Sequence, residues 1–323
     1  MMARPLVLFM RMIFRMLYKT SLTVIMFGGL HLRSKKYYLA KLSISENIFS
    51  STEKRDTIIN KYIPEAILNK DTVIEYEKYN FKITDTKEYK LQDSNYISGN
   101  LSRFRKMTAT ILDGDHTREK TFEDVQAIPV DFLYNIQKEV VAFRTCAEIN
   151  SDKFIENFKR IVEADTRIGD VKLIPYTAAN SIRGFFEEVD VVTQINFNLI
   201  KPNNPGEKEY YDFERIIDDN NLRELDINMS NENGIMYKKE GTNEFTDTIE
   251  SGISLTESAY GTVEVKGYNI IESTVPGKRK DRKQKRKSFR SATSANYPRF
   301  FKTKEVETFK ILKRVHQEIK NLF

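Results

Sequence analysis

The chain has 323 residues, of which 40% are hydrophobic and 30% charged, and its formal net charge is +6. This composition is typical of a globular protein with a substantial core, and the length allows one large domain or two ordinary ones. Its single cysteine, Cys146, excludes an intramolecular disulfide, and so few Cys and His residues exclude a Cys/His-rich zinc site. We therefore expect a cytoplasmic protein without a metal or cofactor, in which Cys146 is a small apolar core residue.

Charge is strongly segregated along the chain. Residues 1–45 hold eight basic and no acidic residues, residues 278–290 carry +8, and residues 291–323 carry +4. Residues 46–277 must then carry −14 for the total to be +6. An acidic body repels nucleic acid, so any contact with a polyanion should be confined to the basic segments.

The N-terminal extension, residues 1–34, is apolar and cationic. Arg11, Arg15 and Lys19 recur every four residues, which predicts an amphipathic helix able to lie on an anionic membrane through residues 1–33. Its uninterrupted apolar stretches are too short for a membrane span. Six of the nine methionines fall within the first 26 residues, so a start further along the chain, for example at Met26, is the alternative.

A strand-rich lobe is predicted over residues 35–165. Alternating apolar residues predict a strand over 38–44, and a helix should follow residues 51–53 and end at Asn69. Aromatic and β-branched residues over 72–112 predict antiparallel strands, and residues 113–116 have the composition of a turn. Two further strands, 128–134 and 139–146, precede a helix that begins at Ser151.

Strands and helices alternate in the second predicted lobe, residues 166–323. We expect strands at 171–176, 189–200, 222–229 and 261–271, and helices at 179–188, 207–219, 246–259 and 303–322. Gly252 weakens the third of these helices. The last helix has an apolar stripe, which favours docking on the core over binding a partner helix. The sequence thus predicts a mixed α/β (α+β) protein with two lobes built on mixed sheets.

The strongest functional signal is the basic segment, residues 278–290, which we expect to be a loop. Such a concentration of charge cannot be buried, so it must contact solvent or a polyanion. Contacts with phosphates would be salt-dependent and would not specify sequence. The candidate nucleic-acid-binding residues are Lys278, Arg279, Lys280, Arg282, Lys283, Lys285, Arg286, Lys287 and Arg290.

Aromatic residues follow among further basic residues. Rings at these positions could stack on bases, although packing of a returning strand in the core is the favoured interpretation. They are Phe289, Tyr297, Phe300 and Phe301.

A weaker pattern indicates an enzyme. Glu264 and Lys266 form a strand-borne Glu-x-Lys, which metal-dependent nucleases use together with an aspartate on a neighbouring strand, here Asp190 or Asp226. An exposed strand face explains the same pattern and is favoured. Asp113, Asp115 and His116 could hold a metal, but a turn in solvent is the simpler interpretation. No residue is therefore assigned as catalytic or metal-binding.

A resemblance extends over residues 36–302. The segments that carry this resemblance are residues 194–205, the helix that follows them, and residues 221–225, 260–267 and 272–274. In these segments the chain resembles an uncharacterised bacterial family associated with mobile elements and phage defence. More distantly, the layout is similar to the phage-exclusion protein RexA. The resemblance implies an α/β cytoplasmic protein that binds DNA without being an established enzyme.

The leading functional hypothesis is a non-enzymatic nucleic-acid-binding component of an anti-phage, abortive-infection-like system. DNA is favoured over RNA, and the acidic body would contact a protein partner or a second copy. The alternatives are a metal-dependent nuclease and a membrane-peripheral effector held by residues 1–33.

Overall fold

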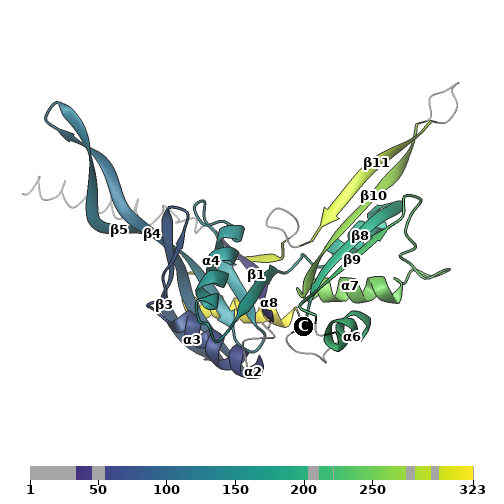
Figure 1. Cartoon of the computed structure of the whole chain (residues 1–323), viewed down its shortest axis with the longest axis horizontal. Helices are drawn as coiled ribbons and strands as arrows, with labels where there is room; N and C mark the ends of the chain where they lie inside the picture. Colours follow the sequence, from purple (N-terminus) through teal and green to yellow (C-terminus); the bar gives the residue numbers. More distant parts are fainter. Residues whose placement is uncertain are drawn as a thin grey trace, which may run out of the picture.

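A computed structural model describes residues 34–45, 55–202, 211–220, 222–273, 281–291 and 298–322. These residues form two sheets with helices packed on them, which confirms the mixed α/β class (Figure 1). All pairs between the described strands are antiparallel, so the expected mixed sheets are antiparallel sheets. The helix between β8 and β9, for example, joins neighbouring strands that run in opposite directions.

The first sheet has eight strands in the order β12-β1-β6-β5-β4-β3-β2, with β7 also paired to β1. Its strands are β1 Lys35–Ser45, β2 Ile74–Tyr76, β3 Tyr79–Leu91, β4 Ser94–Asp113, β5 His116–Asn135, β6 Val140–Arg144, β7 Asp170–Pro175 and β12 Phe300–Thr303. The apolar alternation in β1 serves two cores, because Leu39 faces one side of the sheet while Ala40 and Leu42 face the other.

Helices cover both faces of this sheet. They are α2 Arg55–Thr57, η1 Ile58–Tyr62, α3 Ile63–Leu68, α4 Ser151–Glu163 and α8 Thr308–Lys320. Asn150 begins α4, since its side chain accepts a hydrogen bond from the Lys153 amide at 2.9 Å. In the core beneath α4, Phe154 stacks on Phe143 with ring centroids 4.2 Å apart. Cys146 is partly buried against the same core, as the sequence predicts.

The last helix, α8, packs on the opposite face of the first sheet. Leu312, Val315 and Ile319 are buried there with Tyr37 and Leu39 of β1. Docking on the core, predicted from the apolar stripe, is therefore confirmed. Phe309, which the stripe also included, is 39% exposed instead.

The second sheet has the order β11-β10-β8-β9 and is covered by helices on one face. Its strands are β8 Val191–Ile200, β9 Glu224–Ser230, β10 Gly261–Ser273 and β11 Asp281–Arg290, and its helices are α5 Ser181–Glu188, α6 Tyr211–Asp219 and α7 Asp247–Glu257. Gly252, which weakened the prediction of α7, has a packing reason. A Cβ atom there would lie 2.6 Å from the Phe197 ring, so only glycine lets the helix approach the sheet this closely.

The predicted division between residues 165 and 166 does not match the division between the sheets. From the second half of the chain, β7 and β12 pair with β1, and α8 packs on the same sheet. The edge of β1 opposite β6 would otherwise leave backbone groups unpaired. None of the described helices is both long and apolar enough to cross a bilayer. The proposed membrane helix, residues 1–33, lies outside the described residues.

Candidate nucleic-acid interface

The basic segment was expected to be a loop, and this expectation is wrong for residues 281–290. They form β11, which pairs with β10 from Glu264↔Arg290 to Ser273↔Asp281. Phe289 supplies the one buried apolar side chain among the described residues of this strand, and it attaches the strand to the core. Lys278, Arg279 and Lys280 lie outside the described residues.

The two strands β10 and β11 continue past the rest of the second sheet. Pairing of β8 with β10 ends at Val191↔Tyr268, whereas β10 and β11 stay paired as far as Ser273↔Asp281. From the last pair with β8 onward, residues 268–273 and 281–286 form a two-stranded projection, here called the β10–β11 ribbon. Figure 1 shows it extending away from the helices at one end of the molecule.

Basic side chains lie on both faces of β11. Because successive strand residues point to opposite faces, Lys283 and Lys285 lie on the side of Phe289, while Arg286 and Arg290 lie on the other. These four side chains are exposed and make no ion pair with another described residue. Lys287 is the exception, since its Nζ atom lies 3.4 Å from Glu188 Oε2. The structure thus brings together the basic residues that it describes, with their charge largely uncompensated.

The aromatic residues near the segment mostly belong to the cores, as the sequence favoured. Phe289 is 3% exposed and lies 5.4 Å from the Phe185 ring of α5. Phe301 is also buried and stacks on Tyr37. Phe300 is 44% exposed, but Lys36 Nζ covers its ring at 3.8 Å, and Tyr297 lies outside the described residues. Base stacking therefore gains no support from the two buried rings.

Beside β11, the helix-free face of the second sheet is polar and hollowed, which the sequence interpretation missed. A hollow of 280 Å³ is lined by side chains that include Asn196, Asn198, Asp226, Glu264 and Arg290. The signal was present in β8, where Gln194, Asn196 and Asn198 alternate with buried apolar residues. The face adjoining the basic strand therefore offers hydrogen-bonding groups.

The structure separates Asp190 from Glu264 and Lys266, the other residues of the alternative nuclease site. Glu264 forms an ion pair with Lys266 at 3.3 Å, while Asp190 accepts a hydrogen bond from the Ile270 amide at 2.8 Å. Glu264 lies opposite Asn196, six positions along β8 from Asp190, or roughly 20 Å at the rise of a strand. Asp226 lines the same hollow as Glu264, but no group of three potential metal ligands occurs among the described residues.

The other acidic cluster lies at the tip of a hairpin. Asp113 and His116 form the last pair between β4 and β5, and Asp115 lies in the turn that joins them. Asp113 bonds to Arg118 at 2.8 Å, and both side chains are largely exposed. These residues behave as a turn in solvent, which was the favoured interpretation.

Comparison with known proteins identifies a family without a described activity. The chain belongs to the family of the domain of unknown function DUF4747, whose model matches residues 35–304. This agrees with the sequence resemblance to an uncharacterised family. No curated protein and no solved structure matches the chain.

Proposed function

We propose that this protein binds DNA through the exposed basic side chains of the β10–β11 ribbon. The observation behind the proposal is the group of exposed basic side chains on β11 that have no described ion-pair partner. Phosphate oxygens would supply the missing negative charge and release the counterions that these side chains hold in solution. The polar hollow beside β11 provides further groups for the sugar or bases.

The shape of the ribbon favours DNA over RNA. The major groove of B-form DNA admits a two-stranded ribbon, whereas that of an A-form RNA duplex is too deep and narrow for protein side chains to enter. Basic residues on both faces of the β10–β11 ribbon could reach the phosphates on either side of a groove. The lysines of this edge strand also have a second explanation, because lysines discourage strands of other molecules from pairing with an edge. A direct measurement of DNA binding distinguishes the two explanations.

Salt titration of DNA binding tests this function. A variant with Lys283→Gln, Lys285→Gln and Arg286→Gln should lose about 100-fold in affinity for a short duplex near 50 mM salt. The slope of log affinity against log salt should become shallower by about 2 to 3. A double-stranded RNA of the same length should bind the unaltered protein more weakly.

The matched control changes the same residue types on the β4–β5 hairpin. Lys106→Gln, Arg118→Gln and Lys120→Gln remove three exposed positive charges from another pair of strands and should leave DNA affinity unchanged. Equal losses in both variants would indicate a nonspecific charge effect. An unaltered protein that does not bind DNA at low salt would contradict the proposal.

We further propose that DNA binding serves an anti-phage role related to that of RexA-like proteins. This rests on the sequence resemblance and on the proposed DNA contact. Cells that express the protein should plate phage less efficiently than cells that express the β11 variant. Equal plating at equal protein levels would count against this role while leaving DNA binding intact.

A further inference from the structure

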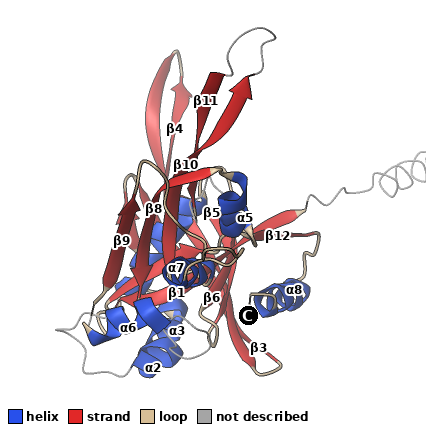
Figure 2. Cartoon of the chain, turned by 90° about the vertical axis from the view of Figure 1, so that its right-hand side faces the viewer, coloured by secondary structure: helices blue, strands red, loops and turns tan. Residues whose placement is uncertain are grey.

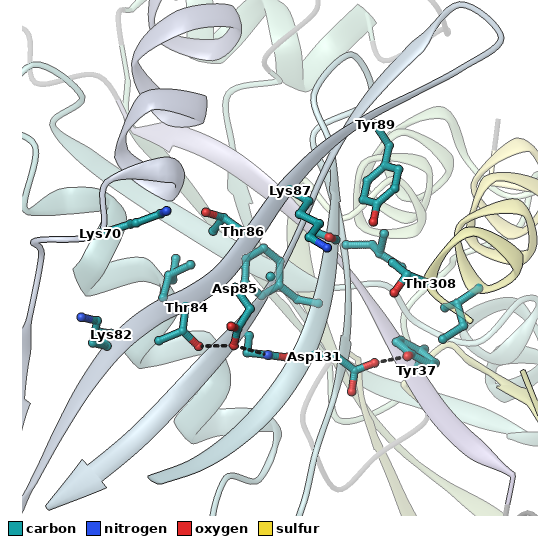
Figure 3. A pocket seen from close by; sticks show the side chains of 17 residues that line it. Tyr37, Lys70, Lys82, Thr84, Asp85, Thr86, Lys87, Tyr89, Asp131 and Thr308 are labelled. Atoms are coloured by element: carbon teal, nitrogen blue, oxygen red, sulfur yellow. Dashed lines mark hydrogen bonds between the residues drawn. The ribbon is translucent and has the colours of Figure 1, made fainter. Parts of the chain in front are cut away.

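A second hollow, far larger than the first, lies on the first sheet beside the start of α8. Its volume is 490 Å³, within the range of small-molecule sites in proteins. Strands β1, β3, β4 and β5 supply most of its walls, and Thr308 and Ile311 of α8 close one side. Figure 3 shows Lys70 and Lys82 at one end, and Tyr89, Thr308 and Tyr37 at the other.

A β-bulge in β3 shapes this hollow. Thr84 pairs with Asn100 and Lys87 with Ser98, so Asp85 and Thr86 both lie opposite the single residue Gly99. Asp85 has a φ of 54°, in the left-handed region that non-glycine residues rarely adopt. Bulges of this kind commonly redirect side chains next to functional sites.

Gly99 leaves space that any other residue would fill. A Cβ atom at this position would lie 2.9 Å from the Phe132 ring and 3.2 Å from the Thr84 carbonyl oxygen. The ring of Phe132 can therefore approach the backbone of β4 closely at Gly99, and both residues line the hollow.

Two carboxylates inside the hollow are held in fixed positions. Asp85 Oδ2 accepts hydrogen bonds from Asn100 Nδ2 at 2.9 Å and Thr84 Oγ1 at 3.0 Å, and these bonds lower the pKa of Asp85. Asp131 accepts bonds from Arg144 Nη1 at 2.6 Å and from the Tyr37 hydroxyl. The carboxylates are oriented acceptors for hydroxyl or amino groups.

The hollow also has excess positive charge. Lys70, Lys82 and Lys87 line it, and none of them makes an ion pair or hydrogen bond with another described residue. Arg144 balances Asp131, so the three lysines face one remaining carboxylate, that of Asp85. An anion bound here would compensate charges that the protein leaves uncompensated.

We propose that this hollow binds a nucleotide, with its phosphate at Lys70 and Lys82. At the aromatic end, the partly exposed Tyr89 provides a surface for a base, while the buried Tyr37 holds Asp131 in place. Asp85 and Asp131 lie between the two ends and can accept hydrogen bonds from ribose hydroxyls or a base amino group. The site is separate from the β10–β11 ribbon, so the inference does not depend on DNA binding.

Isothermal titration calorimetry with AMP, GMP, CMP and UMP tests the proposal on the full-length protein. Ribose 5-phosphate and inorganic phosphate are the comparison ligands. At least one nucleotide should bind with a Kd below about 1 mM and at least about tenfold more tightly than either comparison ligand. Lys70→Gln with Lys82→Gln should weaken that nucleotide about tenfold or more.

The matched control is Lys78→Gln with Lys90→Gln, two exposed lysines close in sequence that do not line the hollow. It should bind the nucleotide like the unaltered protein, and so should the triple β11 variant. Absence of binding by all four nucleotides would overturn the proposal, as would equal weakening in the two lysine pairs. If inorganic phosphate bound as tightly as every nucleotide, the nucleotide assignment would be wrong.

Discussion

The molecule has two long two-stranded projections, and they differ in charge rather than in architecture. Beyond the pairing of β4 with β3, residues 105–126 of β4 and β5 form a β4–β5 ribbon with four basic and five acidic residues. Residues 268–287, which include the β10–β11 ribbon, contain eight basic and two acidic residues. The two ribbons lie at opposite ends of the molecule in Figure 1, and both point upward in Figures 1 and 2.

The difference shows which property of the β10–β11 ribbon requires a functional explanation. A protruding hairpin is not by itself a signal for a polyanion, because the β4–β5 ribbon protrudes while its charges nearly cancel. The β4–β5 ribbon also keeps local ion pairs, as between Arg118 and Asp113. The two ribbons therefore form a natural pair of test and control surfaces.

The largest expected effect is the loss of stability when the buried anchor of β11, Phe289, is truncated, compared with truncation at the exposed tip of the β4–β5 ribbon. Phe289→Ala should lower the free energy of unfolding by about 3 to 4 kcal/mol, because it empties a buried site against Phe185. Leu112→Ala, at the 76% exposed tip of the other ribbon, should change it by less than about 0.5 kcal/mol. Urea unfolding curves measure both changes. Similar losses of stability would show that Phe289 does not anchor β11 more strongly than Leu112 holds the tip of the β4–β5 ribbon.

A smaller effect concerns the helices that cover the second sheet. Arg183 of α5 binds both carboxylate oxygens of Glu250 on α7, at 2.7 and 2.9 Å, and also contacts Glu257. Arg183→Met should destabilise the protein by about 1 kcal/mol, a value reduced for partial exposure. Arg160→Met, which removes an exposed pair within α4, should cost less in the same urea experiment.

The sign of the pH dependence follows from Glu250. Hydrogen bonding to Arg183 lowers the pKa of Glu250 in the folded protein. The stability that this ion pair contributes is therefore fully present above the unfolded pKa of the carboxyl group, about 4.3, and is lost as the pH falls through the lower folded pKa. Arg183→Met should therefore flatten the acid limb of the stability curve. An unchanged acid limb would contradict the assigned role of this ion pair.

Lysine acetylation compares the two ribbons within one molecule. Bound DNA should slow modification of Lys283 and Lys285 about fivefold, which corresponds to about 1 kcal/mol of protection. Lys106 and Lys120 of the β4–β5 ribbon are equally exposed and should react at unchanged rates. Mass spectrometry reads all four sites together, and uniform protection would place the DNA elsewhere.

The smallest expected effect is a change of stability with pH at His316 of α8, away from both ribbons. His316 Nδ1 lies 2.6 Å from the Tyr96 hydroxyl and Nε2 lies 3.0 Å from Gln92 Oε1, and burial, with nearby Lys320, lowers the pKa of His316. Stability should therefore fall by less than about 1 kcal/mol as the pH drops below 6.5, because the unfolded chain binds the proton more readily. His316→Gln should remove this step from melting curves, and a persisting step would assign it to another group.

Most strands and helices could be predicted from periodicity, because their apolar faces repeat with the spacing of the elements. The pairing could not, since nothing in residues 300–303 indicates that they return to β1. The basic segment gives no strand signal, because Phe289 is its one apolar residue and apolar alternation is absent from its sequence. The high charge of the segment favoured a loop over a strand. Long basic side chains can nevertheless occupy an edge strand, because their charged ends stay in solvent.

The candidate sites were predictable only in part. The basic residues of β11 form a group that is visible in the sequence because of their density, and their binding to DNA stays a prediction. The nucleotide hollow was not, because its walls come from β1, β3, β4, β5 and α8, and its shape depends on a bulge at Asp85. Such a site exists only after distant segments have paired.

The position of β1 has a consequence for synthesis of the chain. Its partners are residues 140–144, 170–175 and 300–303, so the first of the described strands waits for the last of them. Until β12 and α8 have left the ribosome, one edge of the nascent sheet lacks its cover. The first sheet therefore cannot be completed before residues 300–303 have been made, and during that interval the unpaired edge is open to other chains.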